Sequence, residues 1–269
     1  MKIIRFMSIL VAFSLPSQAP GKAKAPAAAM VSYADVADLA TEAPIIAKAR
    51  IASVKSVEIK GDTPSLPTRS YHNITVRIDS LIRGEGGLAP RVSFLAVAGS
   101  QRPRSGTTVL LYARPGKQSN HVQLISLHAL QPWSVELETV TRAVTSEVLS
   151  ANPAPAILAV GDAFHVPGTV EGESETQIFL KTTTGAPVSL SIVHRPAEAT
   201  RWGVSLGEIV DDAAVPPARN TLLWYRLACG LPDTLPASST RGLAVLDAEA
   251  TRRDYRFVME SLGRCGRTL

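Results

Sequence analysis

Residues 203–207 read Gly-Val-Ser-Leu-Gly, the G-x-S-x-G spacing that presents a nucleophilic serine at a strand-to-helix turn. Ser205 would attack a substrate carbonyl, with His194 as the general base and Asp211 or Asp212 as the acid that orients it. Two features oppose this hypothesis. The residues before the string are too polar for a buried strand, and all five histidines precede Ser205, whereas α/β-hydrolases place the histidine last. Hydrolysis by Ser205 and His194 is therefore only an alternative hypothesis, and the sequence predicts no catalytic residue.

The spacing of histidines and carboxylates predicts no metal site. His121 and His128 are seven residues apart around a candidate strand, which places them on opposite faces of an extended chain. Asp162 and His165 lack a third ligand of suitable spacing. The alternating glutamates within residues 171–175 share a face if extended, but they favour a solvated strand edge over a cation site.

Phosphate and cofactor chemistry have no support either. Residues 84–87 are glycine-rich but lack the lysine and hydroxyl residue of a P-loop, so no cofactor is expected. The one basic concentration lies near the C-terminus and favours a solvated helix face over a polyanion site. Its members are Arg252, Arg253, Arg256, Arg264 and Arg267.

The N-terminal 29 residues have the pattern of a secretory signal peptide, with Lys2 and Arg5 before an apolar run over residues 6–15. Cleavage is expected within residues 19–30, and the small residues 27–29 fit it best. Removing four of the 28 basic residues with this segment leaves 24 against 23 acidic residues. A mature chain so close to neutral does not indicate a nucleic-acid partner. A periplasmic or secreted location is expected.

The chain contains two cysteines, Cys229 and Cys265. In an oxidising compartment, an even and minimal cysteine count predicts one disulfide. Two buried free thiols are the alternative, and a metal site would need further ligands nearby. The predicted bridge would tie a C-terminal helix back to the preceding segment.

Residues 30–152 are expected to form a domain with an OB-like β-barrel and flanking helices. A capping box at Ser32 to Asp35 starts a short helix, and residues 131–134 start a second one. Five candidate strands lie between these helices, separated by Gly, Pro, Ser and Asn, which is typical of a small barrel. They cover residues 45–57, 74–78, 92–98, 107–113 and 122–127.

Residues 153–269 are expected to form a second domain, a β-sandwich with a disulfide-linked terminal helix. The boundary is the proline-rich segment at residues 152–155, and Asp247 is expected to cap the last helix. The fold class is therefore mainly β with a few helices. The candidate strands of this half cover residues 157–160, 164–166, 176–181, 188–194 and 222–227.

Five segments carry a resemblance: YADVADL (33–39), ITVRI (74–78), GESETQIFL (172–180), WGVSLGEIV (202–210) and LWYRLAC (223–229). They resemble a family of exported, uncharacterised proteins of Gram-negative bacteria. This resemblance implies a periplasmic or secreted protein and carries no activity. The first half is also loosely similar to the secreted OB-like barrels of metalloprotease inhibitors, but the N-terminal cysteine that reaches the protease metal has no counterpart here.

The short-strand architecture without a convergent catalytic set predicts a non-catalytic binding or adaptor module in the cell envelope. Its partner is expected to be a protein or an envelope polymer, with no transmembrane segment in the mature chain. Hydrolysis by Ser205 and His194, and protease inhibition, are the alternatives.

Overall fold

A computed structural model describes residues 31–60, 68–86, 88–99, 102–207 and 214–269. The expected signal segment and two residues of the hydrolase hypothesis, Asp211 and Asp212, lie outside the described residues. Residues 31–269 form one compact unit. None of the helices that the structure describes combines the length and apolarity needed to cross a membrane.

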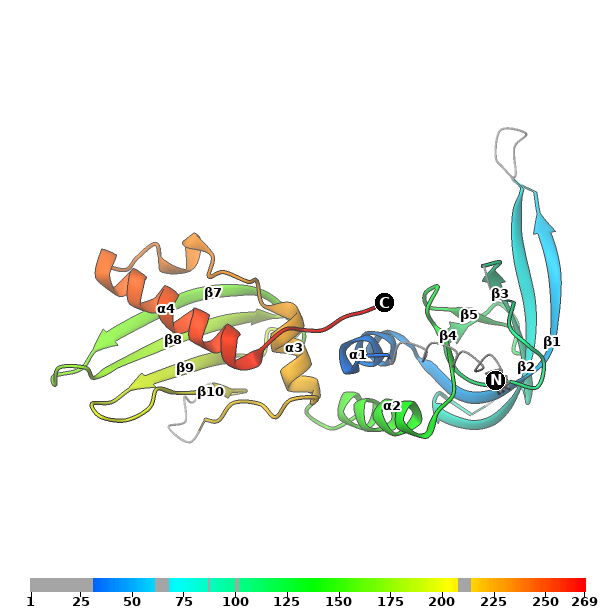
Figure 1. Ribbon diagram of the computed structural model, residues 1–269, viewed down its shortest axis with the longest axis horizontal. Coiled ribbons are helices and arrows are strands. Elements are labelled where there is room, and N and C mark those ends of the chain that lie inside the picture. The colour runs from blue at the N-terminus through cyan, green and yellow to red at the C-terminus, as the bar shows by residue number, and fades with distance from the viewer. Residues whose placement is uncertain (1–30, 61–67, 87, 100–101, 208–213) are drawn as a thin grey trace, which may run out of the picture. The chain divides into compact units, whose positions relative to one another are not determined.

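The described residues form ten strands in two antiparallel sheets, together with four α-helices (Figure 1). The prediction of a mainly β protein is confirmed. The first half of the chain contains α1 (Tyr33–Glu42), β1 (Ile45–Ile59), β2 (Arg69–Arg83), β3 (Arg91–Val97), β4 (Thr108–Pro115), β5 (Val122–Leu124), β6 (Leu130–Pro132) and α2 (Val135–Val148). The second half contains β7 (Ile157–Pro167), β8 (Ser174–Thr182), β9 (Val188–His194), β10 (Arg201–Ser205), α3 (Leu222–Gly230), a 3₁₀ turn (Ala237–Thr240) and α4 (Val245–Leu262).

The first sheet has the strand order β3-β2-β1-β4-β5, and β6 also pairs with β4. Strand β1 is long enough to pair with both β2 and β4, and shifts in its register with β2 mark bulges or irregular pairing. A single parallel bridge, from Ser93 in β3 to His121 before β5, joins the two ends of this order. Strand β6 was not predicted, because Gln131 and Pro132 were assigned to the start of the second helix, which in the structure begins only after Ser134.

The second sheet has the order β10-β9-β8-β7, and helix α4 lies across one of its faces (Figure 1). The core beneath α4 includes Ile178 and Ile192 from the sheet and Tyr255 and Val258 from the helix. A helix layer therefore takes the place where the sequence predicted the second sheet of a sandwich. The predicted strands at 157–160 and 164–166 are one strand, β7, with a register shift between them.

Residues 222–227 were predicted to be a strand, and this prediction is wrong because they lie in α3. Thr221 accepts a hydrogen bond from the Trp224 backbone at the helix N-terminus, and a continuous apolar run does not distinguish a buried helix from a strand. Asp247 is not the N-cap of α4 either. The cap is Ala244, and Asp247 lies in the first turn.

The first helix is anchored through the side chain that caps it. The capping box between Ser32 and Asp35 is present, as predicted. The same Asp35 carboxylate accepts hydrogen bonds from the Thr268 hydroxyl at 2.6 Å and from the backbone of Thr268 and Leu269. Asp35 is only 2% exposed, so α1 and the C-terminal tail share one buried acceptor.

The tail has two further attachments. Cys265 forms a disulfide with Cys229 of α3, with their Cα atoms 4.9 Å apart. Arg267 binds Asp38 with two hydrogen bonds of 2.6 and 2.9 Å, and the Tyr225 hydroxyl donates to the same carboxylate. Arg267 is thus structural and does not belong to a solvated basic face. Since α1 precedes β1 and Tyr225 lies in α3, these contacts link the two predicted domains across the boundary at 152–155.

Asp35 predicts a specific loss of stability in acid. Burial raises the pKa of its carboxyl, but hydrogen bonds from Thr268, Ser32 and Leu269 outweigh burial and hold the pKa at about 2. Because this value lies below the ordinary one of about 3.9, the contribution is complete above pH 4 and is lost as the pH falls towards 2. We expect this loss to be about 1 to 2 kcal/mol, reduced by solvent screening near the surface.

Urea unfolding of the wild type and of Asp35→Asn at pH 6, 4, 3 and 2 measures this contribution. The variant is expected to be less stable at pH 6 and to approach the wild type at pH 2. An equal difference at every pH would contradict the role of the ionised carboxylate.

Candidate binding groove

A groove of about 1090 Å³ lies around the ends of β9 and β10 where the two strands meet. We call it the β9–β10 groove. Its walls are the β7–β8 turn, the start of β10, one turn of α4 and the segment Ala214 to Pro216. The polar side chains that matter to its chemistry are Glu175, Ser191, His194, Arg195, Thr200 and Arg201.

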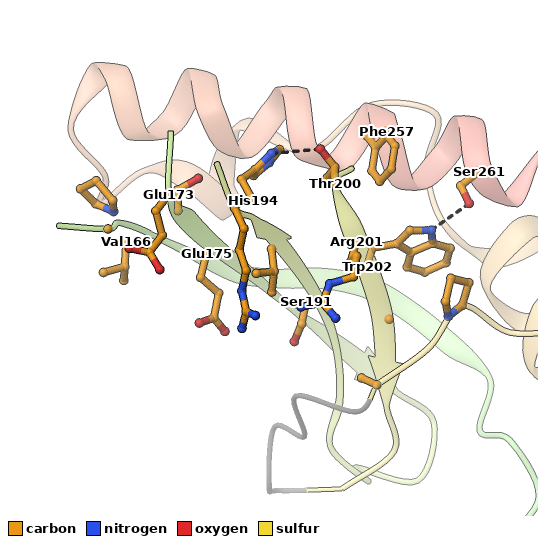
Figure 2. A pocket seen from close by; sticks show the side chains of 18 of the residues that line it. Val166, Glu173, Glu175, Ser191, His194, Thr200, Arg201, Trp202, Phe257 and Ser261 are labelled. Atoms are coloured by element: carbon orange, nitrogen blue, oxygen red, sulfur yellow. Dashed lines mark hydrogen bonds between the residues drawn. The ribbon is translucent and has the colours of Figure 1, made fainter. Parts of the chain in front are cut away.

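The strand register determines which of these residues share the sheet face opposite α4. In antiparallel sheets, directly paired residues lie on one face. Glu175 of β8, Val193 of β9 and Arg201 of β10 therefore form one row across three strands. Gln177, Ser191 and Gly203 form the next row. Figure 2 shows Glu175, Ser191 and Arg201 on the side of the sheet away from helix α4.

Gly203 is the residue that allows the groove wall to approach β10. A Cβ atom at this position would lie 2.2 Å from the carbonyl carbon of Ala214, and the Val204 backbone donates to the Val215 carbonyl at 3.3 Å. Residues 214–216 thus cover part of the outer edge of β10 at a distance that no side chain on Gly203 would permit. Gly207, the second glycine of the G-x-S-x-G string, lies in a bend that follows β10. The string therefore does not place its serine at a turn between a strand and a helix.

Ser191 has an unusual environment for a hydroxyl. It is 7% exposed, lines the groove, and its Oγ atom has no hydrogen-bond partner within the described part of the chain. Ser189, two residues earlier on the same face, is 3% exposed and its Oγ atom also has no hydrogen-bond partner among the described residues, but Ser189 does not line the groove. A buried hydroxyl without a partner costs about 1 to 3 kcal/mol, so two of them in neighbouring positions need a physical explanation.

A chain of hydrogen bonds runs on the other face of the sheet, beneath α4. The carboxylate of Asp254, which is 5% exposed, accepts from the Thr176 hydroxyl and from Nε2 of His194 at 2.7 Å. Nδ1 of His194 lies 3.1 Å from the Thr200 hydroxyl (Figure 2), and Nδ1 of His165 lies 2.8 Å from the Thr176 hydroxyl. Because a carboxylate only accepts, Nε2 of His194 carries a proton, and Nδ1 is the acceptor for Thr200 in neutral imidazole.

This chain positions the two arginines of the groove. His194 and Thr200 close the β9–β10 turn by bonding to each other, and Asp254 anchors the pair to α4. Arg195 and Arg201 each follow one residue later, and successive side chains of extended backbone point to opposite faces. The buried network therefore places Arg195 and Arg201 on the groove side. The turn also contains Ala197 at φ 61°, a left-handed conformation that costs about 1 kcal/mol for an L residue.

Asp254, His194 and Thr200 are connected in the same way as the acid, imidazole and hydroxyl of an activated nucleophile. The hydroxyl in this arrangement is that of Thr200 and not that of Ser205, which the sequence suggested. Ser205 pairs with Ser189, five residues before His194 along β9. At about 3.3 Å per residue, the side chains of Ser205 and His194 lie roughly 16 Å apart. The hypothesis of hydrolysis by this pair is therefore wrong. Ser205 is 9% exposed and interacts with another group of the protein, so its side chain is not free.

Two of the histidines considered for metal binding have hydrogen-bond partners within the protein. His121 lies next to Asn120, with its Nδ1 2.9 Å from the amide oxygen, and His165 belongs to the Asp254 network. No group of three or more His, Cys, Asp or Glu residues that could hold a metal ion occurs among the described residues. No protein-family model matches the chain, and no curated protein is significantly similar to it.

Sequence reasoning selected His194 but missed Asp254, Thr200, Ser191 and the two arginines. Asp254 lies 60 residues from His194 along the chain, so no local spacing links them. One sequence signal could have brought the groove residues together. His194 ends one strand and Arg201 begins the next, and residues on either side of a short turn between adjacent strands lie close to each other.

Proposed function

We propose that the protein is an exported, non-catalytic binding module of the cell envelope, and that the β9–β10 groove is its ligand site. The observation that carries the proposal is Ser191, a residue of the groove lining whose buried hydroxyl has no hydrogen-bond partner among the described residues. Concave sites with a few well-placed polar groups are typical of ligand binding. A ligand that bonds to Ser191 would compensate the desolvation of its hydroxyl.

Export is supported by the signal-like N-terminus of the sequence and by the disulfide, which is stable in an oxidising compartment. We further propose that the first half is an OB-like barrel. Its strand order, with β1 paired to both β2 and β4, and the parallel bridge between Ser93 and His121 support this assignment. Such barrels are common binding scaffolds.

Retention of an envelope component tests the function. Val193→Trp would fill the middle row of the groove from a half-buried position on β9. Val97→Trp is the matched control, because it makes the same change at an exposed position on β3 of the other sheet. Each immobilised, oxidised protein is incubated with envelope extract, and its retained components are measured by mass spectrometry after an unchanged melting temperature has been verified.

We expect one component to be retained by the wild type and by Val97→Trp, and to fall at least tenfold on Val193→Trp. Equal retention by all three proteins would overturn the assignment of the groove as the binding site.

One observation favours a second candidate, an acyl hydrolase with Thr200 as its nucleophile. Thr200 lies at hydrogen-bond distance from His194, which Asp254 orients. In such an enzyme the Thr200 oxygen would attack an ester carbonyl, and its proton would pass to His194 and then to the leaving alkoxide. A fluorophosphonate reagent distinguishes the candidates, because an adduct on Thr200 found by mass spectrometry would support hydrolysis and its absence would favour the binding module.

A further inference from the structure

We propose that the β9–β10 groove binds an extended peptide through a carboxylate held between Arg195 and Arg201, with a hydrogen bond from Ser191. This inference rests on the proposed function and names its ligand class.

The two arginines are available for a ligand. Both side chains are exposed and line the groove, and neither makes an ion pair or a hydrogen bond within the described part of the chain. In contrast, Arg267 and Arg142 are each engaged by a carboxylate. The two guanidinium groups flank one short turn, and the carboxylates of the same lining, Glu173, Glu175 and Glu260, form no ion pair with them among the described residues, so both can bind an anion from outside.

The donor set fits a carboxylate. Guanidinium groups present planar pairs of N–H donors that match the two oxygens of a carboxylate. Ser191 lies one row from Arg201 on the same face, and its hydroxyl has no acceptor inside the described protein. Three donors from two strands would then surround one acceptor group.

The other features of the groove favour a peptide as the bearer of this carboxylate. Glu175 and Arg201 lie in the same row, on either side of Val193. The Glu175 carboxylate could accept from N–H groups of a bound peptide, and the Arg201 guanidinium could donate to its carbonyl groups. Two small residues of the lining, Ser191 and Gly203, are paired across β9 and β10 and leave room beside the strands. Of the two aromatic residues in the described lining, Trp202 is only 6% exposed and donates to Ser261 of α4, so Phe257 of α4 is the one partly exposed ring that a sugar could stack on.

The position of the arginines depends on the Asp254 network beneath them. The His194–Thr200 bond sets the width of the turn, and each arginine follows one member of this pair. Loss of that bond would separate the two guanidinium groups without changing either of them. This dependence distinguishes a built carboxylate site from two unrelated surface arginines.

Three pools of randomised pentapeptides test the inference on the immobilised, oxidised chain. The first pool lacks Asp and Glu and ends in an amide. The second is identical but ends in a free carboxylate, and the third ends in an amide and has Glu fixed at its centre. Retained peptides are measured by mass spectrometry, and the last two pools distinguish a terminal from a side-chain carboxylate.

We expect a carboxylate-bearing pool to be retained at least tenfold more than the first pool, since a charge-assisted bidentate pair contributes about that factor. Arg195→Gln and Arg201→Gln should each remove most of this preference, and Ser191→Ala should weaken it about threefold to tenfold. Arg114→Gln is the matched control, because Arg114 is an exposed strand arginine of the other sheet and should change nothing.

Equal retention of all pools, or a preference that survives both arginine substitutions, would overturn the inference. Retention of trigalacturonate, an acidic sugar, on the immobilised protein while no peptide pool is retained would overturn the assignment of a peptide as the ligand. If the envelope component is still lost on Val193→Trp in either case, the proposed function stands and only the ligand class is wrong.

Discussion

Replacement of Asp254 by alanine is expected to lower the free energy of unfolding by about 3 kcal/mol. The substitution removes one buried carboxylate and leaves the Nε2–H group of His194 and the Thr176 hydroxyl without their acceptor. The buried Thr176 hydroxyl loses its partner at a cost of about 1 to 3 kcal/mol, and a carboxylate acceptor lies at the upper end of that range; His194, whose side chain is 32% exposed, adds less because water can reach its ring. Urea unfolding at pH 7 measures the loss.

Glu249→Ala is the matched control, because Glu249 is an exposed carboxylate on the same helix. It should change stability by no more than about 0.5 kcal/mol. The ¹⁵N shift of His194 Nε2 gives a second measurement, since this nitrogen loses its carboxylate acceptor in Asp254→Ala and its resonance should move. A loss of stability no greater than that of the control, or an unchanged Nε2 resonance, would contradict the hydrogen-bond network described above.

The second large effect is expected from the disulfide. Replacing Cys229 and Cys265 together by alanine opens a loop with a sequence separation of 36 residues. The chain-entropy model gives a loss of about 3 to 4 kcal/mol. For a chain of this size, such a loss lowers the melting temperature by roughly 8 to 12 °C. The loss should also loosen the tail, because Arg267 and Thr268 follow the bridge and bind Asp38 and Asp35.

Reduction of the wild type provides the internal control for this prediction. Dithiothreitol should lower the stability of the wild type by the same amount and leave the alanine variant unchanged. If the wild type keeps its melting temperature in the reductant, the bridge does not contribute as described.

The elements that were predicted correctly from the sequence are those with local signals. The capping box at Ser32 to Asp35, the alternation of β1 and the turn residues between strands are encoded within a few positions. The error at residues 222–227 has a physical cause. The run Leu-Leu-Trp-Tyr-Arg-Leu is apolar except at Arg226 and has no clear period, so only the Thr221 cap distinguishes the helix from a strand, and that signal is a single residue.

The candidate site could not be predicted in the same way, because its parts meet only through pairing of strands and packing of α4. Ser191 and Arg201 are ten residues apart, and their place on one face follows from the register Gly203 to Ser191. Asp254 reaches His194 only because α4 crosses the sheet. The G-x-S-x-G string was misleading for the same reason, since the register that joins β9 to β10 separates Ser205 from His194.

The most direct measurement of the central claim is photo-crosslinking from within the groove in cells. A benzophenone amino acid at Val215, an exposed residue of the groove wall, should form an adduct with a cell-envelope component. The same amino acid at Leu149, an exposed residue that follows α2, serves as the matched control and should give no such adduct. An adduct at Val215 that disappears in the Val193→Trp background is the result we predict. Equal crosslinking from both positions, or none from Val215, would contradict a ligand site in the β9–β10 groove.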